Sequence, residues 1–184
     1  MKKFLIIGNG NAVKYKEIFP LIKDNKMWLG VNNGVVNFIT GDSVKDVYIY
    51  WFTNLEHNKQ RCPIELTKHY SPDSYYKYLN YNAINVDKVK DIPMDYDGIM
   101  GVPISFLNKY CPEQFEIVGC PAANVVPEGW KRMSKSFVDL YYAQGGTGQY
   151  QEGKRLEHYT KDGNAIIPYS RILIKRKDEK QKLN

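Results

Sequence analysis

The stretch Val47-Tyr48-Ile49-Tyr50-Trp51-Phe52-Thr53 decides how the rest of this sequence is interpreted. Each of its residues is β-branched or aromatic, and these two classes of side chain are enriched in strands. It lies within a longer segment, 46–55, that no glycine or proline interrupts. The stretch therefore predicts the central strand of a sheet.

The amino-terminal side of this strand predicts a strand, a helix and a second strand. Residues 3–7 form a short apolar run ended by Gly8, which is typical of a buried strand. A helical repeat follows, which Asn9 or Asn11 can cap and which Pro20 kinks or restarts. Its apolar positions, at i, i+3, i+4 and i+7, are Tyr15, Ile18, Phe19 and Ile22. Residues 26–31 predict the second strand, and Asn32-Asn33-Gly34 predicts the turn that ends it.

The carboxy-terminal side begins with a long irregular segment, 58–97, in which only residues 83–86 read as a strand. Pro103 opens a short helix over 104–110, and a strand over 115–119 follows. The weakest pattern covers 120–164, which ends in the hairpin turn Lys161-Asp162-Gly163-Asn164. A last strand is predicted over 166–175. This order predicts the α/β class, with one small mixed sheet and a long irregular insertion.

Length and composition exclude several classes of protein. One domain accommodates the 184 residues, since domains commonly hold about 100–200 residues. Charged residues are 25% and hydrophobic residues 43% of the chain, which excludes a disordered or coiled-coil protein. No run approaches the roughly 18 apolar residues of a spanning helix, and residues 1–8 are too short for a signal peptide. We expect a cytoplasmic protein with no membrane partner.

The charge of the chain is uneven, and its aromatic content is high. The net charge is +6, and residues 171–184 hold six basic and two acidic side chains. A basic end favours polyanions in general, and a solvated terminus explains it equally well. Tyrosine, with 15 residues, outnumbers phenylalanine, with 7. Such amphipathic rings serve binding surfaces as well as cores.

The sequence contains no complete motif for binding a metal, binding a nucleotide or covalent catalysis. Gly8-Asn9-Gly10 follows a strand, but Val13 replaces the third glycine of a dinucleotide fingerprint and no acid follows the next strand. The histidines have no ligand spacing and are expected on the surface or in loops; they are His57, His69 and His158. The cysteines form no CxxC pair and are expected to be buried or inert; they are Cys62, Cys111 and Cys120. We expect no metal and no cofactor.

Several ordered stretches carry a resemblance to a known family. They are Lys3–Asn9, Asn11–Lys23, Trp28–Gly30, Trp51–Leu55, Tyr78, Asn80-Tyr81, Ala83-Ile84, Lys88–Pro93, Asp95–Ile104, Phe115–Gly119 and Arg171–Lys177. Together they resemble the carboxy-terminal half of the EcoRI-type adenine-specific DNA methyltransferase family. The resemblance spans nearly the whole chain except about Cys120 to Ile167.

The resemblance implies a fold and a missing activity. The implied fold is the carboxy-terminal half of a Rossmann-like methyltransferase, as a single domain over 1–177 with a basic tail over 178–184. In the family, the amino-terminal half carries the S-adenosylmethionine pocket and an Asn-Pro-Pro-Phe motif that holds the target adenine. This sequence has no Asn-Pro-Pro, Asp-Pro-Pro or Ser-Pro-Pro triplet. A methyltransferase-derived protein that is catalytically inactive is therefore expected.

The resemblance also suggests candidate binding residues. Asn9, Asn11, Trp51, Asn54 and Tyr81 are matched polar and aromatic positions expected near a pocket for a flipped adenine. Alternatively, Asn9 and Asn11 only cap a helix and Trp51 only packs. The full candidate set for a nucleic-acid or partner surface is Asn9, Asn11, Trp51, Asn54, Tyr75, Tyr76, Tyr78, Tyr81, Lys131, Arg132, Lys175, Arg176 and Lys177.

Changes from the family pattern in the tyrosine-rich loop favour a binding role. Tyr76 replaces a proline, and Leu79 and Asn82 replace two aspartates, which makes this loop more basic and more aromatic. The first interpretation is a protein that binds nucleic acid or a nucleic-acid enzyme. One alternative is a phage or mobile-element inhibitor of a bacterial defence nuclease, such as an anti-CRISPR or anti-restriction protein. Another is one subunit of a split adenine-specific methyltransferase.

The strand predicted over residues 3–7 suggests that the chain has a partner. If residues 3–7 form the strand that adjoins the missing half, that strand leaves an unpaired edge or an uncovered apolar face. We therefore expect a homodimer or an obligate partner.

Overall fold

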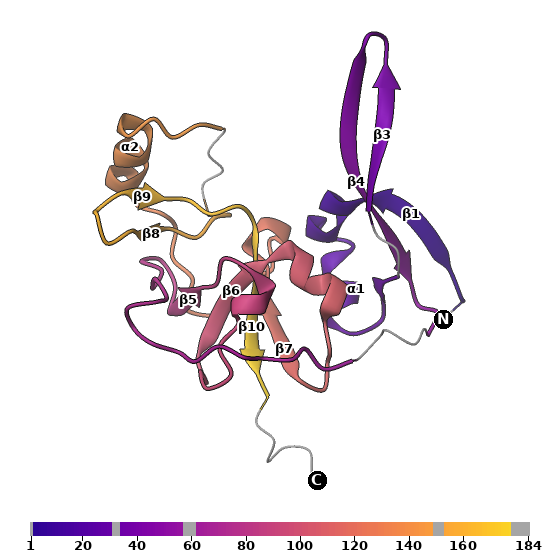
Figure 1. Cartoon of the computed structure of the whole chain (residues 1–184), viewed down its shortest axis with the longest axis horizontal. Helices are drawn as coiled ribbons and strands as arrows, with labels where there is room; N and C mark the ends of the chain where they lie inside the picture. The colour runs from indigo at the N-terminus through magenta and orange to yellow at the C-terminus, as the bar shows by residue number, and fades with distance from the viewer. Residues whose placement is uncertain (1, 31–33, 57–61, 149–152, 178–184) are drawn as a thin grey trace.

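The computed structural model describes residues 2–30, 34–56, 62–148 and 153–177 (Figure 1). Its strands are β1 (Leu5–Asn9), β2 (Trp28–Leu29), β3 (Gly34–Thr40), β4 (Ser43–Thr53), β5 (Ala83–Asn85), β6 (Ile99–Pro103), β7 (Phe115–Gly119), β8 (His158–Tyr159), β9 (Ala165–Ile166) and β10 (Arg171–Arg176). Its α-helices are α1 (Phe19–Lys23) and α2 (Lys135–Ala143), and its 3-10 helices are η1 (Gly10–Lys14), η2 (Val89–Asp91), η3 (Ile104–Lys109) and η4 (Pro121–Ala123).

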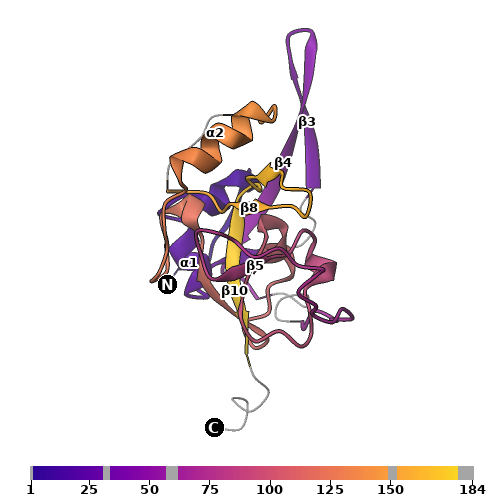
Figure 2. The same ribbon diagram turned by 90° about the vertical axis from the view of Figure 1, so that its left-hand side faces the viewer.

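The first sheet is built around β4, which confirms the predicted central strand. Strands β1, β2 and β3 all pair with β4 in antiparallel register. β1 and β2 pair with its last residues, and β3 pairs along its first seven, from Ser43 to Ile49. As a result, β3 and the first part of β4 form a two-stranded ribbon that stands away from the rest of the molecule (Figures 1 and 2).

The second sheet is mixed and has the order β5-β6-β10-β7. β5 and β6 are parallel, whereas β10 is antiparallel to both of its neighbours. The predicted strands over 83–86 and 115–119 are confirmed as β5 and β7. The α/β class with small sheets is confirmed, but the expectation of one mixed sheet is wrong, since two four-stranded sheets and a small hairpin, β8-β9, are present.

One hydrophobic core joins the two four-stranded sheets. Phe52 on β4 belongs to the same buried cluster as Met100 on β6 and Ile172 on β10. Phe106 on η3 packs edge-on against Phe115, with ring centroids 5.4 Å apart. Burying such large side chains stabilises the fold by about 1.5–3 kcal/mol each, which fixes the two sheets against each other.

The elements predicted at the amino terminus are a strand and a helix, as observed, but the strand is more exposed and the helix is shorter than predicted. The strand predicted over 3–7 is β1, but Leu5, Ile6 and Ile7 are 51%, 55% and 56% exposed, because β4 is the one described strand that pairs with it. The helix begins only at Phe19 because Pro20 lacks an N–H and suits the first turn. Asn9 caps the 3-10 helix η1, as predicted for a helix cap.

Several carboxy-terminal features differ from prediction. The hairpin turn 161–164 is confirmed between β8 and β9, with Gly163 at φ +79°. The last strand begins at Arg171, because Ile166 pairs with β8 instead. Neither α2 nor β6 was predicted. Of the predicted turn Asn32-Asn33-Gly34, Gly34 begins β3, while Asn32 and Asn33 lie outside the described residues, as do His57 and the basic tail 178–184.

The thiols and histidines divide into buried and exposed groups. Cys111 and Cys120 are buried as predicted, and burial raises the pKa of both thiols, that of Cys120 to about 11. Cys62 is exposed. His69 is exposed, but the prediction of a surface or loop histidine is wrong for His158, which is 3% exposed and stacks on Tyr76. Among the described residues, no helix is long and apolar enough to span a membrane.

A buried polar connection ties the segment around Asn80 to the chain before β8. The Asn80 amide donates to the Arg155 carbonyl over 2.9 Å and accepts from the Glu157 N–H over 3.2 Å. Glu157 is only 4% exposed, and its Oε2 has no hydrogen-bond partner among the described residues. Burial raises the pKa of this carboxyl to about 7.

Because Glu157 is buried, we expect the stability of the protein to depend on pH, and we expect Glu157→Gln to remove this dependence. Because the folded-state pKa exceeds the ordinary value of 4.5, its contribution to stability is full below about pH 4.5 and is lost as pH rises through about 7. Glu157→Gln should raise the free energy of unfolding at pH 8 by up to about 3 kcal/mol and leave it nearly unchanged at pH 4.5. Urea denaturation at both pH values measures this, with exposed Glu65→Gln as the control. An equal effect of Glu157→Gln at both pH values would contradict it.

Candidate nucleic-acid interface

Tyr169, just before β10, joins two distant parts of the chain at the surface. Its hydroxyl donates to Asn11 Oδ1 over 2.6 Å and accepts from Lys14 Nζ over 2.8 Å. Lys14 Nζ also lies 4.7 Å from the Tyr169 ring centroid, and Arg155 Cζ lies 5.4 Å from it. Tyr169 remains 52% exposed. We call Asn11, Lys14, Arg155 and Tyr169 the Tyr169 cluster.

A hollow of about 520 Å³ lies on one side of the Tyr169 cluster. It is lined by the end of β1, by η1, β4 and η3, and by the residue before Ser170, namely Asn9, Gly10, Asn11, Asp46, Val47, Tyr48, Tyr50, Ile104, Ser105 and Tyr169. Tyr48 and Tyr50 are two residues apart on β4 and therefore face the same side of the sheet. The predicted candidates Asn9 and Asn11 thus lie together, next to aromatic rings.

A second hollow, of about 360 Å³, lies on the other side of Tyr169. Tyr141 and Tyr142, at the end of α2, line it together with Arg155 and the backbone around Pro168. The hydroxyls of both tyrosines donate to backbone carbonyls, of Thr147 and Gly148. Tyr169 is the residue that lines both hollows, so the two hollows adjoin at this side chain.

The chemistry of this surface suits an anionic, aromatic ligand. Lys14 and Arg155 supply positive charge, and both lower the pKa of the Cys120 thiol beneath them, against the larger effect of burial. The rings of Tyr48, Tyr142 and Tyr169 are 66%, 42% and 52% exposed and can stack on nucleobases. Asp46 is the carboxylate among the described lining residues of the first hollow. The cations and rings together resemble the pattern used to bind single bases and phosphates.

Trp51 and Asn54 lie away from this surface. Trp51 alternates with Tyr50 on β4 and so points to the opposite side of the sheet. Gly30 donates its N–H to the Trp51 carbonyl over 2.7 Å, and a Cβ at Gly30 would lie only 2.8 Å from Trp51 Cβ. Asn54 accepts from the Phe4 N–H and donates to the Lys2 carbonyl, both over 2.9 Å. Its amide therefore holds the chain that leads into β1.

The four candidate tyrosines are mostly part of the core. Tyr75, Tyr78 and Tyr81 are 9%, 6% and 7% exposed. The Tyr75 hydroxyl donates to the Asp91 carbonyl, and the Tyr78 hydroxyl donates to Asn85 Oδ1. Burial raises the pKa of all three hydroxyls. Tyr76 is half-buried and stacks on His158, with centroids 5.0 Å apart.

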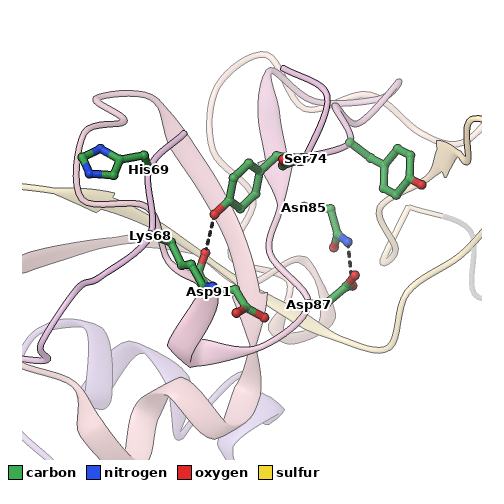
Figure 3. A pocket seen from close by; sticks show the side chains of 8 residues that line it. Lys68, His69, Ser74, Asn85, Asp87 and Asp91 are labelled. Carbon is green, nitrogen blue, oxygen red and sulfur yellow. Dashed lines mark hydrogen bonds between the residues drawn. The ribbon is translucent and has the colours of Figure 1, made fainter. Parts of the chain in front are cut away.

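Tyr75 and Tyr76 line a separate polar hollow of about 280 Å³ (Figure 3). Its other lining residues are Lys68, His69, Ser74, Asn85, Asp87 and Asp91. Asp87 accepts from the Asn85 amide over 2.8 Å and pairs with Arg171 over 3.3 Å. Because cations and carboxylates are mixed there, this hollow is less suited to a polyanion than the Tyr169 surface.

The candidate basic residues lie in two other parts of the fold, before α2 and at the end of β10. Lys131 and Arg132 are exposed on the segment before α2, where the Lys131 N–H donates to the Asn80 carbonyl. Lys175 and Arg176 lie at the end of β10, and Lys177 follows it. Arg176 pairs with Asp97 over 3.1 Å. Tyr169 precedes the other end of β10, so these cations do not join the Tyr169 cluster.

The central residues of the surface were not predicted. Lys14 and Tyr169 are 155 residues apart in sequence, and a single sequence gives no signal that they meet. Arg155, Tyr141 and Tyr142 lie within 120–167, where no stretch of the sequence was matched to the family by inspection. The available signal was the excess of tyrosine over phenylalanine, which indicates surface rings without saying where they gather.

Comparisons with known proteins bear on this surface. A family model described as "Adenine-specific methyltransferase EcoRI" matches residues 1–177. The chain is 46% identical over 138 residues to the Type II methyltransferase M.EcoRI of Escherichia coli, which is 64% of this chain and 42% of that protein. It is 38% identical over 143 residues to the Type II methyltransferases M.MpnI of Mycoplasma pneumoniae and M.MgeORF184P of Mycoplasma genitalium, 66% of this chain and 45% of each relative.

The chain spans less than half the length of the curated relatives it matches. No solved structure matches it.

The hydrogen bonds of Asn54 indicate that it stabilises the fold and is not a contact residue of the Tyr169 surface. Asn54→Ala removes two hydrogen bonds to the backbone of residues 2 and 4 and should lower the free energy of unfolding by about 1–2 kcal/mol. Urea denaturation measures this loss, and amide exchange at Phe4 and Leu5 should become faster. Variant and wild type should bind DNA alike when both are folded. A loss of DNA binding without a loss of stability would show that Asn54 is a contact residue instead.

Proposed function

The chain belongs to the family of the adenine-specific methyltransferase EcoRI, and on that premise we propose that it binds DNA through the Tyr169 cluster and the two hollows beside it. Its relatives are Type II methyltransferases, which makes the chain a methyltransferase-derived protein. DNA is the proposed ligand of this chain. The observation that carries the proposal is the gathering of Lys14, Arg155 and Tyr169 beside exposed aromatic rings.

Positive charge supports this choice of ligand. The chain carries a net charge of +6, which attracts DNA from solution before any specific contact forms. Lys14 and Arg155 are half-buried, so their cationic groups are partly shielded from solvent. Arg155 Nη1 is further fixed by a hydrogen bond to Ser170 Oγ over 3.0 Å. Two cations with restricted side chains lose little freedom when they contact phosphates.

The aromatic rings support contacts to bases beside the phosphate contacts. Each exposed tyrosine offers a flat face, and stacking of a base on such a face contributes about 1–3 kcal/mol. Asn9 is exposed beside them, and its Oδ1 accepts from the Asn11 N–H. Its Nδ2 can donate to a base acceptor, since amide side chains pair well with base edges. The surface therefore combines backbone contacts with groups that read bases.

We propose further that these 184 residues do not transfer a methyl group by themselves. No Asn-Pro-Pro triplet occurs in them, and the resemblance places that motif, which holds the target adenine, in the amino-terminal half of the family. The glycine-rich turn at Gly8-Asn9-Gly10 does not fit the methyl donor either. It leads into the short 3-10 helix η1, the Asn9 side chain bonds back to the turn, and no acid follows the next strand to hold a ribose.

If Lys14 and Arg155 contact phosphates, removing both should change how DNA affinity depends on salt. Lys14→Ala with Arg155→Ala should weaken binding of a mixed-sequence duplex and reduce the slope of log affinity against log salt by about 2, one for each lost phosphate contact. Fluorescence anisotropy across a salt series measures the slope. Circular dichroism confirms that the double variant is folded.

The matched control removes the same charge elsewhere. Lys26→Ala with Lys90→Ala lowers the net charge equally, at two exposed positions outside both hollows. This control should keep most of the slope. If both double variants reduce the slope equally, the binding is non-specific attraction to the whole protein and the Tyr169 cluster has no special role.

We expect these 184 residues to transfer no methyl group to DNA by themselves. The chain incubated with isotopically labelled S-adenosylmethionine and DNA should incorporate no label above a protein-free control, and calorimetry with S-adenosylmethionine should show no heat. The same preparation must bind DNA by anisotropy, which shows that it is active as a binder. Saturable incorporation of label into adenine would refute the proposed inactivity.

A further inference from the structure

The ribbon of β3 and residues 43–48 of β4 has a free strand edge. β3 pairs with β4 from Gly34 opposite Ile49 to Thr40 opposite Ser43. No other described strand pairs with β3. Figures 1 and 2 show from two sides that this ribbon stands clear of the rest of the molecule. The outer backbone groups of β3 are thus available to a further strand.

The residues of β3 make this edge unusually suited to pairing. Val35, Val36, Phe38 and Ile39 are 44%, 38%, 49% and 81% exposed. Residues 34–40, Gly-Val-Val-Asn-Phe-Ile-Thr, contain no charge and no proline. Natural proteins usually protect a free edge with charged residues, proline or a bulge. A free edge without any of these indicates that another strand covers it.

The order of residues in β3 fits a second copy of the same strand. Around Asn37 the pattern is symmetric: Val36 and Phe38 flank it, then Val35 and Ile39, then Gly34 and Thr40. A two-fold axis requires that residue i of one copy meets residue j of the other, and that j meets i. With Asn37 on the axis, Val36 lies opposite Phe38 of the second copy, and Val35 lies opposite Ile39. Each apolar side chain then meets an apolar side chain.

Charge does not oppose the same pairing. Lys45 and Asp46 lie on β4, opposite Phe38 and Asn37 in the register of the ribbon. When two β3 strands pair, the two Asp46 side chains are three strand spacings apart, about 14 Å, which exceeds the screening length of about 8 Å at physiological salt. β3 itself carries no charge that attracts a polyanion, and Asp42 and Asp46 outweigh Lys45 beside it, so the β3 edge offers DNA no electrostatic attraction. A second copy is therefore a better partner for it than DNA.

We propose that two copies of this chain associate through their β3 strands, antiparallel and centred on Asn37, to form a four-stranded ribbon in the order β4-β3-β3-β4. The ribbon lies within residues 1–177, the part of the chain that the family model matches. The Tyr169 cluster lies outside the ribbon in each copy, and the ribbon reaches the first hollow only through residues 46–48 of β4.

A charge at the two-fold axis tests the proposal. Asn37→Lys places two ammonium groups opposite each other in the dimer, whereas within one chain the lysine faces Asp46. The variant should therefore fold but dimerise at least tenfold more weakly, as sedimentation equilibrium of the full chain measures. Thr40→Lys is the matched control, because Thr40 lies opposite Gly34 of the second copy and should leave the dimer intact.

A cross-linking experiment tests the register directly. In a Cys62→Ser background, which removes the exposed native thiol, Asn37→Cys should form an interchain disulfide, because paired Cα atoms are about 4.5–5.5 Å apart. Ile39→Cys should not, since the two positions are about 13 Å apart along the strands. A wild-type monomer at micromolar concentration would overturn the proposal, as would equal cross-linking at both positions. A monomer in which Asn37→Lys alters DNA affinity would assign the ribbon to DNA instead.

Discussion

The antiparallel pairing of β4 with three other strands is the constraint on which the amino-terminal half of the molecule depends. β1, β2 and β3 each pair with β4 and with no other described strand. The alternation of β4 places Tyr50 and Phe52 on its inner face, where both are buried. Phe52 then connects this sheet to the core shared with the second sheet. One strand therefore sets the sheet, part of the core and one wall of the first hollow.

A second connection places the proposed binding surface on this frame. The Tyr169 hydroxyl bonds to Asn11 and Lys14, so the residue that precedes β10 is joined to η1, which directly follows β1. These bonds are exposed, and each contributes only about 1 kcal/mol. Their importance is geometric, because they hold a ring and a cation between two hollows. A ligand that contacts both hollows would contact residues from both ends of the sequence.

Local sequence patterns predicted the strands that are continuous in β-branched or aromatic residues, above all β4 and β7. They failed where burial depends on a neighbour far away in sequence. Residues 5–7 are as apolar as a core strand, yet no described element covers their exposed side chains. The helix α2 escaped prediction because only Phe137 and Val138 of it are buried, which leaves no clear repeat. Asn9 and Asn11 were predicted from the resemblance, whereas Lys14, Arg155 and Tyr169 meet only in the folded chain.

The central claim is that DNA contacts the Tyr169 cluster, and amide hydrogen exchange with and without bound duplex tests it most directly. The account predicts slower exchange in residues 9–14, 155–156 and 169–171, with little change around the polar hollow at 68–91 or at the end of β10. Protection confined to 68–91 or 175–177, with none at 9–14, would contradict it and would place the DNA on a different face of the protein.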